Sequence, residues 1–178
     1  MYKGSKHSWG LIAKSFHWVV AIMVIWQLFT GFNLSIMDFS PQKIALIGLH
    51  KIFGTFIFVF ILLRLFWRFY NNPPSNSELP KFHRIISLIV HNFLYILVIL
   101  TTVQGTLMTQ VGGFDVQLLG LITLPRLISE NLDMYPLFKS FHYTLWMLLL
   151  FTFIMHLIAG LYHRFSGDQY GIWKRMSF

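Results

Sequence analysis

Cysteine is absent from the 178 residues of this chain. Without thiols the protein can form neither disulfides nor thiolate-bound iron–sulfur clusters, and it lacks the C-x-x-C-H motif that attaches a c-type haem. A haem, if the protein binds one, must therefore be held non-covalently, by histidine or methionine.

Charged residues are also scarce. They make up 11% of the chain, whereas a soluble domain carries about 25%, and hydrophobic residues make up 56%. The net charge is +8, with only six Asp and Glu, but the basic residues lie at the ends of apolar runs. This pattern is typical of membrane topology and argues against nucleic acid as a partner.

Four apolar runs are long enough to cross a hydrocarbon core, which takes about 20 helical residues. Backbone polar groups must be satisfied within lipid, so each run is expected to be helical. We predict an all-α integral membrane four-helix bundle, a single domain over residues 1–178, in contact with membrane lipid. The spans are expected near residues 15–35, 47–69, 85–109 and 140–163. The first run lacks a small-residue cleavage site and is expected to be a retained span.

The basic residues are distributed unequally between the two sides of such a bundle. The side that holds the two ends of the chain and the connection between the second and third spans carries ten of the 14 Lys and Arg; the other side carries four. The positive-inside rule therefore predicts that both termini are cytoplasmic.

Histidine is unusually frequent: the chain has eight, compared with 20 Lys, Arg, Asp and Glu together. His142 and His156 lie 14 residues apart on the fourth predicted helix, which is about 21 Å and close to four whole turns. Both therefore face the same way at different depths. This arrangement suits two stacked haems, one in each leaflet.

The same interval recurs on the other three helices, where it joins His17 to Gly31, His50 to Arg64, and His91 to Gly105. Glycine at haem depth would let a flat macrocycle approach the helix backbone, as small residues do for helix packing. An arginine within the membrane is costly unless it is paired, so we expect Arg64 to bind a haem propionate.

Depth also suggests which histidines pair. His50 should face His142 and hold the outer haem, whereas His156 has two candidate partners for the inner haem, His17 and His91. Counting residues from the inner surface favours His91. The count leaves the choice open, because a lysine such as Lys14 can extend its side chain along the membrane to reach water.

With these spacings the chain resembles the bacterial cytochrome b561 family of small di-haem membrane proteins. The matching pieces lie on every helix: Phe16-His17-Trp18; Gly48-Leu49-His50 with Gly54 and Arg64; His91 with Tyr95 and Gly105; Lys139-Ser140-Phe141-His142; and Met155-His156 followed by His163.

The resemblance implies a multi-pass protein of the bacterial inner membrane with two b haems. It implies that His50 and His142 bind the outer haem iron, that His17 and His156 bind the inner one, and that His91 lies beside the inner site. It also implies ubiquinone or another quinone as substrate near the inner haem, where Ser15 and His163 match positions associated with the quinone site. His163 lies seven residues beyond His156 and could carry a proton.

The resemblance further implies a possible enzyme activity, because the family includes proteins that oxidise superoxide at the outer face and reduce ubiquinone. Positive charge would steer this small anion, and Lys51 and Lys139 lie beside the outer ligands, with Lys43 and Arg126 nearby. The outer loops are neutral overall, which departs from a strongly basic funnel.

Two other functions use the same residues. The first is a membrane-anchor cytochrome that relays electrons between a partner dehydrogenase or haem protein and the quinone pool, with residues 112–139 as a docking loop. The second is a small metal transporter. Haem is preferred over a bare ion because ligands about 21 Å apart on one helix cannot share one ion.

Overall fold

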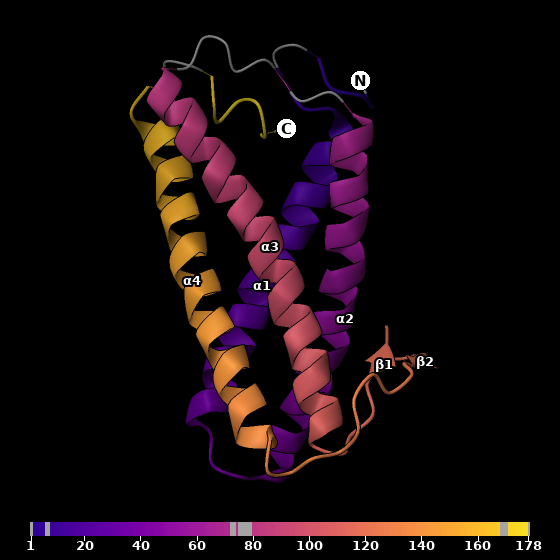
Figure 1. Cartoon of the computed structure of the whole chain (residues 1–178). Helices are drawn as coiled ribbons and strands as arrows, with labels where there is room; N and C mark the ends of the chain where they lie inside the picture. The colour runs from indigo at the N-terminus through magenta and orange to yellow at the C-terminus, as the bar shows by residue number, and fades with distance from the viewer. Residues whose placement is uncertain (1, 6–7, 72–73, 75–79, 168–170, 178) are drawn as a thin grey trace.

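The computed structural model describes the chain except for residues 1, 6–7, 72–73, 75–79, 168–170 and 178. Four long helices form the body of the described part, and a small hairpin follows the third (Figure 1). In chain order the elements are α1 (Leu11–Ile36), α2 (Pro41–Tyr70), α3 (Lys81–Val111), β1 (Gln117–Leu118), β2 (Ile122–Thr123) and α4 (Tyr135–Phe165). The fold class predicted from the sequence is confirmed.

The helices are longer than the spans expected from hydropathy alone. They contain 26, 30, 31 and 31 residues, whereas about 20 residues cross the hydrocarbon core. At α2 a local signal accompanies the additional turns: Ser40 caps the helix by accepting a hydrogen bond from the Lys43 N–H at 3.2 Å, and Pro41 occupies its first turn. A polar cap extends a helix beyond the apolar run, which a hydropathy count does not register.

The outward faces of the helices are apolar. Large hydrophobic side chains such as Ile22, Phe29, Phe66 and Phe151 are each more than 60% exposed. All four helices are long and apolar enough to span a membrane. A surface of this kind is soluble only in lipid, so the chain is a multi-pass membrane protein.

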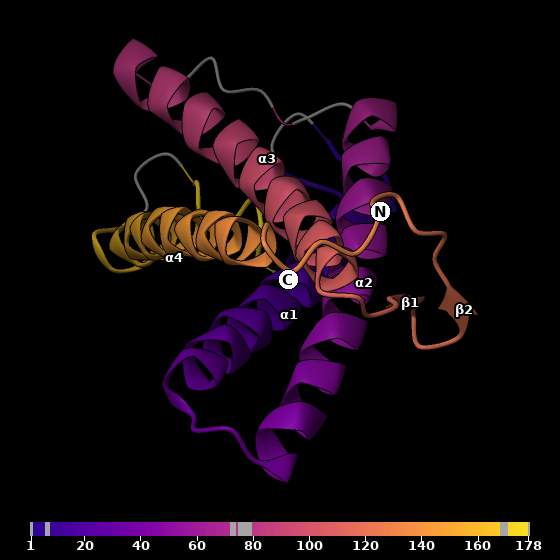
Figure 2. The ribbon, with the colours of Figure 1, turned by 60° about the horizontal axis from the view of Figure 1, so that its bottom comes forward.

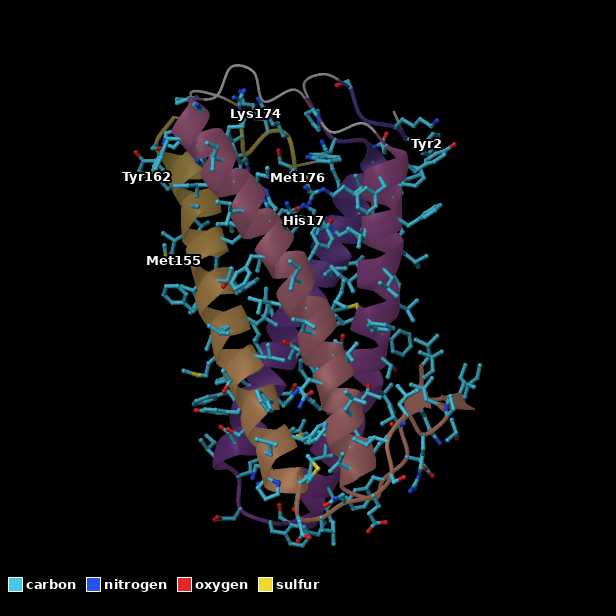
Figure 3. The ribbon with its side chains drawn as sticks, in the orientation of Figure 1. Tyr2, His17, Met155, Tyr162, Lys174 and Met176 are labelled. Carbon is cyan, nitrogen blue, oxygen red and sulfur yellow. The ribbon has the colours of Figure 1, made fainter. Side chains whose placement is uncertain are left out.

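The helices run antiparallel, each packed on the next in chain order. The described residues nearest to the two ends of the chain, including Tyr2 and Met176, lie at one end of the bundle, called here the termini end (Figure 3). The β1–β2 hairpin lies toward the opposite end, called the hairpin end (Figure 1).

The packing around the bundle is uneven. Neighbouring helices pack extensively along the α1–α2, α2–α3 and α3–α4 edges, whereas α1 and α4 meet over few residues. Seen from the hairpin end, α4 is splayed away from the α1–α2 pair (Figure 2). The α1–α4 edge is therefore the least tightly closed side of the bundle.

An apolar core occupies the middle of the bundle, between the two histidine levels. Its buried members come from all four helices: Val20, Val24, Leu28, Ile57, Ile61, Tyr95, Leu97, Val98 and Leu149. On α4, Leu149 lies midway between His142 and His156. The core thus separates two polar sites along the bundle axis.

The loop between α3 and α4 contains the hairpin, a detail that the sequence did not predict. β1 and β2 pair antiparallel, with Leu118 opposite Ile122. The turn has positive φ at Leu119 and Gly120, and Thr55 of α2 accepts a hydrogen bond from the Leu119 N–H at 2.9 Å. This contact holds the hairpin against the side of α2.

Candidate haem sites

The five histidines within the bundle fall into two groups. His50 of α2 and His142 of α4 form the hairpin-end pair. His17 of α1, His91 of α3 and His156 of α4 form the termini-end cluster. Neighbouring helices are antiparallel, so the two residues of each 14-residue pair lie at opposite ends of the bundle. The first residue of the pair lies at the termini end on α1 and α3 and at the hairpin end on α2 and α4.

The hairpin-end pair places two imidazoles opposite each other across the bundle, with their planes nearly perpendicular. Their ring centroids are 6.4 Å apart and their planes lie at 86°. Gly31 and Gly105 lie against these rings: a Cβ added at Gly31 would be 3.5 Å from Cε1 of His50, and one at Gly105 would be 3.0 Å from Cε1 of His142. The two glycines therefore make room at this site.

Hydrogen bonds from α1 hold His50 in place. The Thr30 hydroxyl lies 2.9 Å from Nδ1 of His50, and the Gln27 side-chain amide donates to the His50 carbonyl at 2.7 Å. Thr30 is buried, with 1% of its surface exposed. With Nδ1 of His50 hydrogen-bonded, Nε2 is the nitrogen that remains for a ligand.

The termini-end cluster has three rings. His156 lies between His17, at a centroid distance of 6.2 Å and an interplanar angle of 76°, and His91, at 5.3 Å and 73°. Nδ1 of His91 also lies 3.2 Å from the Ser87 hydroxyl. The three rings, Arg64 and Tyr95 line one cavity.

Arg64 reaches this cluster from α2. Its Nη2 lies 2.9 Å from Nδ1 of His17, and its guanidinium stacks over the Tyr95 ring at 5.1 Å. Arg68, one turn along α2, lies over the same ring at 5.2 Å. Two cations thus contact one buried tyrosine beside the histidines.

The ring separations discriminate between the possible pairs. A metal–imidazole bond is about 2 Å long, and the ring centroid lies about 1 Å beyond the nitrogen, so imidazoles on opposite faces of one metal have centroids roughly 6 Å apart. The distances of 6.4 Å for His50 and His142 and 6.2 Å for His17 and His156 match this requirement. The 5.3 Å between His91 and His156 is shorter than this separation.

Two further features fit a flat ligand at the hairpin end. Nδ1 of His142 is buried without a hydrogen-bond partner in the described part of the chain, and such a group normally costs about 1–3 kcal/mol. Beside it, Gly105 lets the His142 ring lie directly against the α3 backbone, since an added Cβ would be 3.0 Å from Cε1. The residues present therefore fit an iron porphyrin held between His50 and His142.

Other residues expected at the sites lie outside these clusters. Ser15 of α1 and Lys139 of α4 are exposed, and His163 is half-buried beside the Tyr162 ring at 5.7 Å. A Cβ at Gly54 would meet the Gln27 amide at 3.3 Å, so this glycine borders the support of His50 rather than the imidazole.

Sequence reasoning missed several supporting side chains. His50 forms hydrogen bonds with Thr30 and Gln27, and His91 forms one with Ser87. The Trp146 ring lies against Gly31, with its Nε1 3.1 Å from the position of an added Cβ. Threonine and glutamine on an apolar helix were a usable signal, because polar side chains in lipid require partners.

The C-terminal segment closes over the termini end. Trp18 Nε1 donates to the Met176 carbonyl at 3.0 Å, and Lys14 Nζ donates to the Ser177 carbonyl at 2.6 Å. The Trp18 ring also contacts those of His17 and Trp173. Figure 3 shows His17 inside the bundle with Met176 close by. This segment links the weakly packed α1–α4 edge.

A bare metal ion would need three or more ligands that converge on it. Within the described residues no group of three or more His, Asp and Glu lies close enough to hold one.

Comparison with known proteins identifies the family. A family profile, that of prokaryotic cytochrome b561, matches residues 8–178. The chain is also 25% identical over 181 residues to "Cytochrome b561 homolog 2" of Escherichia coli (strain K12), covering 98% of this chain and 94% of that protein. It is thus a multi-pass protein of the bacterial inner membrane that belongs to the prokaryotic cytochrome b561 family.

Proposed function

We propose that this protein carries electrons across the membrane through two b haems, one bound by His50 and His142 and the other by His17 and His156. Family membership already indicates transmembrane b-haem electron transfer. The observation that supports the two-site form is the pair of imidazole separations, 6.4 and 6.2 Å, at two levels of one bundle. Haem held by these two pairs of histidines would supply one-electron transfer and would leave no open position for oxygen.

At the termini end we assign His17 rather than His91 as the partner of His156. The centroid distance supports this choice, as does the resemblance of Phe16-His17-Trp18 to the family pattern. His91 then borders the site without binding iron, held by Ser87 on its own helix.

We propose further that the termini end faces the cytoplasm and exchanges electrons with quinone. The charge bias supports the orientation: ten of the 14 Lys and Arg, among them Arg64, Arg68, Arg84 and Arg164, belong to the side of the termini end, and four belong to the other side. His163, near the end of α4, would carry a proton to or from the quinone, and Ser15 would contact it from α1.

Superoxide is the proposed electron donor at the opposite face. Lys51 and Lys139 support this assignment, because they lie next to or three residues from the hairpin-end ligands and form no ion pair among the described residues. Arg126 adds less charge than the sequence implied, since it is paired with Asp115 at 3.0 Å.

The test is a dithionite-reduced spectrum of the purified protein with haem quantification. We expect two b haems per chain, one in His17→Ala and still two in His91→Ala, with His83→Ala as a control because His83 is exposed on α3. Two haems in His17→Ala together with one in His91→Ala would transfer the ligand role to His91. A protein without reducible haem would overturn the proposal.

The rival function, a membrane anchor for a partner dehydrogenase or haem protein, uses the same haems and is separated by biochemistry. A stable partner that co-purifies in mild detergent and is required for quinone reduction would support the anchor. Quinone reduction by the isolated chain with superoxide as donor would support the function proposed here.

A further inference from the structure

At each site a polar side chain from a neighbouring helix lies at Nδ1 of one histidine, a neutral hydroxyl at one site and a cation at the other. At the hairpin end, Nδ1 of His50 faces the Thr30 hydroxyl at 2.9 Å. At the termini end, Nδ1 of His17 faces the Arg64 guanidinium at 2.9 Å.

The direction of the Thr30 contact follows from its second partner. A hydroxyl has one proton, and Thr30 donates it to the Gln27 carbonyl at 3.1 Å. Thr30 therefore accepts from the His50 Nδ1–H. A histidine that donates its second N–H is a more basic ligand, and a more basic ligand favours the oxidised metal.

The Arg64 contact differs in kind. A guanidinium only donates, whereas a neutral His17 that held iron through Nε2 would carry its proton on Nδ1, so Arg64 would act on this site through its charge and not through this hydrogen bond. Arg64 carries a positive charge at the cluster, and Arg68 places a second one over the same Tyr95 ring. Positive charge beside a redox centre favours its reduced form, which carries one positive charge less.

The remaining charges reinforce this difference along the bundle axis. The acidic residues that the structure describes, Asp38, Asp115, Glu130 and Asp133, all lie in loops at the hairpin end. Among the described residues the one ion pair, Arg126 with Asp115, lies there too. Neither Arg64 nor Arg68 has a carboxylate partner in that part of the chain.

We propose that Arg64, with Arg68, is a positioning residue that makes the termini-end haem the higher-potential centre, so that electrons pass from the hairpin end to the termini end. The proposal rests on the two-haem function above. The transfer moves one electron, oxidising one site and reducing the other, and it neither forms nor breaks a bond. It also suits a membrane that is negative inside, because the fixed charges offset the cost of moving an electron inward.

The test is a potentiometric titration of the purified holoprotein, followed by its visible spectrum. We expect two resolved centres. Arg64→Gln, which keeps an N–H donor but removes the charge, should lower the ferrous-to-ferric ratio of the higher-potential centre at a fixed potential by roughly tenfold or more, which is about 59 mV for one electron. Arg64→Lys keeps the charge and should leave most of that ratio intact.

Thr30→Val is the matched variant at the other site, since it keeps the shape and removes the acceptor. It should raise the reduction potential of the lower-potential centre and leave the potential of the other centre unchanged. If Arg64→Gln shifted the lower-potential centre, or if both Arg64 variants left both centres unmoved, the proposal would be overturned.

Failure of the underlying function gives a different result. A wild-type protein with fewer than two haems would refute the two-haem proposal, whereas two haems with an unchanged titration in Arg64→Gln would refute only the role of Arg64. If Arg64→Gln lost a haem, the titration of Arg64→Lys would still test the charge effect. A higher-potential haem that is present in Arg64→Lys at its wild-type potential would support the effect, and its absence would contradict it.

Discussion

His142 lies directly against Gly105, so that a Cβ added to this glycine would be 3.0 Å from Cε1 of the imidazole. The neighbouring α3 backbone thereby limits where the ring can go. Gly31 has the same relation to His50 and Trp146 on the opposite side of the site. At the hairpin-end pair, α1 and α3 each place a glycine against an imidazole. Adding a side chain at either glycine tests whether the close contact matters.

Gly105→Ala should reduce occupancy of the hairpin-end haem, because the new methyl group displaces His142 by a few tenths of an ångström. Overpacking of this kind costs about 1–3 kcal/mol. Haem content per chain and thermal unfolding in detergent measure the effect. Gly48→Ala is the control: nothing lies within 4 Å of its added Cβ, so it should keep both haems and gain about 0.5–1 kcal/mol.

His163→Ala should leave both haem spectra intact while slowing quinone reduction several-fold. The reason is position: His163 lies seven residues beyond His156, half-buried at the end of α4. Stopped-flow haem oxidation by a soluble quinone measures the step, with His83→Ala as the exposed control. Loss of a haem from His163→Ala would instead assign this residue to the structure of the site.

Trp18→Phe should loosen the C-terminal segment, since it removes the bond to the Met176 carbonyl and keeps an aromatic ring beside His17. One lost hydrogen bond corresponds to about 1 kcal/mol. Hydrogen exchange at the Met176 and Ser177 amides, which donate to Trp173, should become faster. Trp26 is 41% exposed, and Trp26→Phe should leave this exchange unchanged. Equal exchange in the two variants would contradict a clasp at this end.

Lys139→Gln should slow haem reduction by superoxide more than Arg126→Gln does, because Arg126 is already paired with Asp115. Steering by exposed charge is screened by salt, so the wild-type rate should fall as ionic strength rises. Stopped-flow measurements at several salt concentrations provide the rates. A rate that is independent of salt in all three proteins would rule out steering.

Much of the architecture could be predicted from particular residues. The apolar runs predicted four spanning helices, because in lipid the backbone N–H and C=O groups must form their hydrogen bonds within each segment. The 14-residue interval between His142 and His156 predicted two levels, because helical rise and pitch convert spacing directly into depth and face. Helix ends were less accurate, since caps such as Ser40 extend α2 beyond its apolar run.

The partner of His156 could not be predicted in this way, although depth did predict that His50 faces His142. Depth counting favoured His91 as the partner of His156, whereas the centroid distances favour His17. Separation across a bundle depends on how each helix is rotated and how closely its neighbour packs, and spacing within one helix carries no information on either quantity.

The sequence by itself determined that this protein lives in lipid, that its helices place histidines at two depths, and that glycines and an arginine accompany them at the same interval. Only the tertiary structure decided that Thr30 supports His50, that Arg64 contacts His17, and that the C-terminal segment reaches Trp18. The physical reason is that periodicity is a property of one helix, whereas these contacts join two segments whose relative rotation is set by packing.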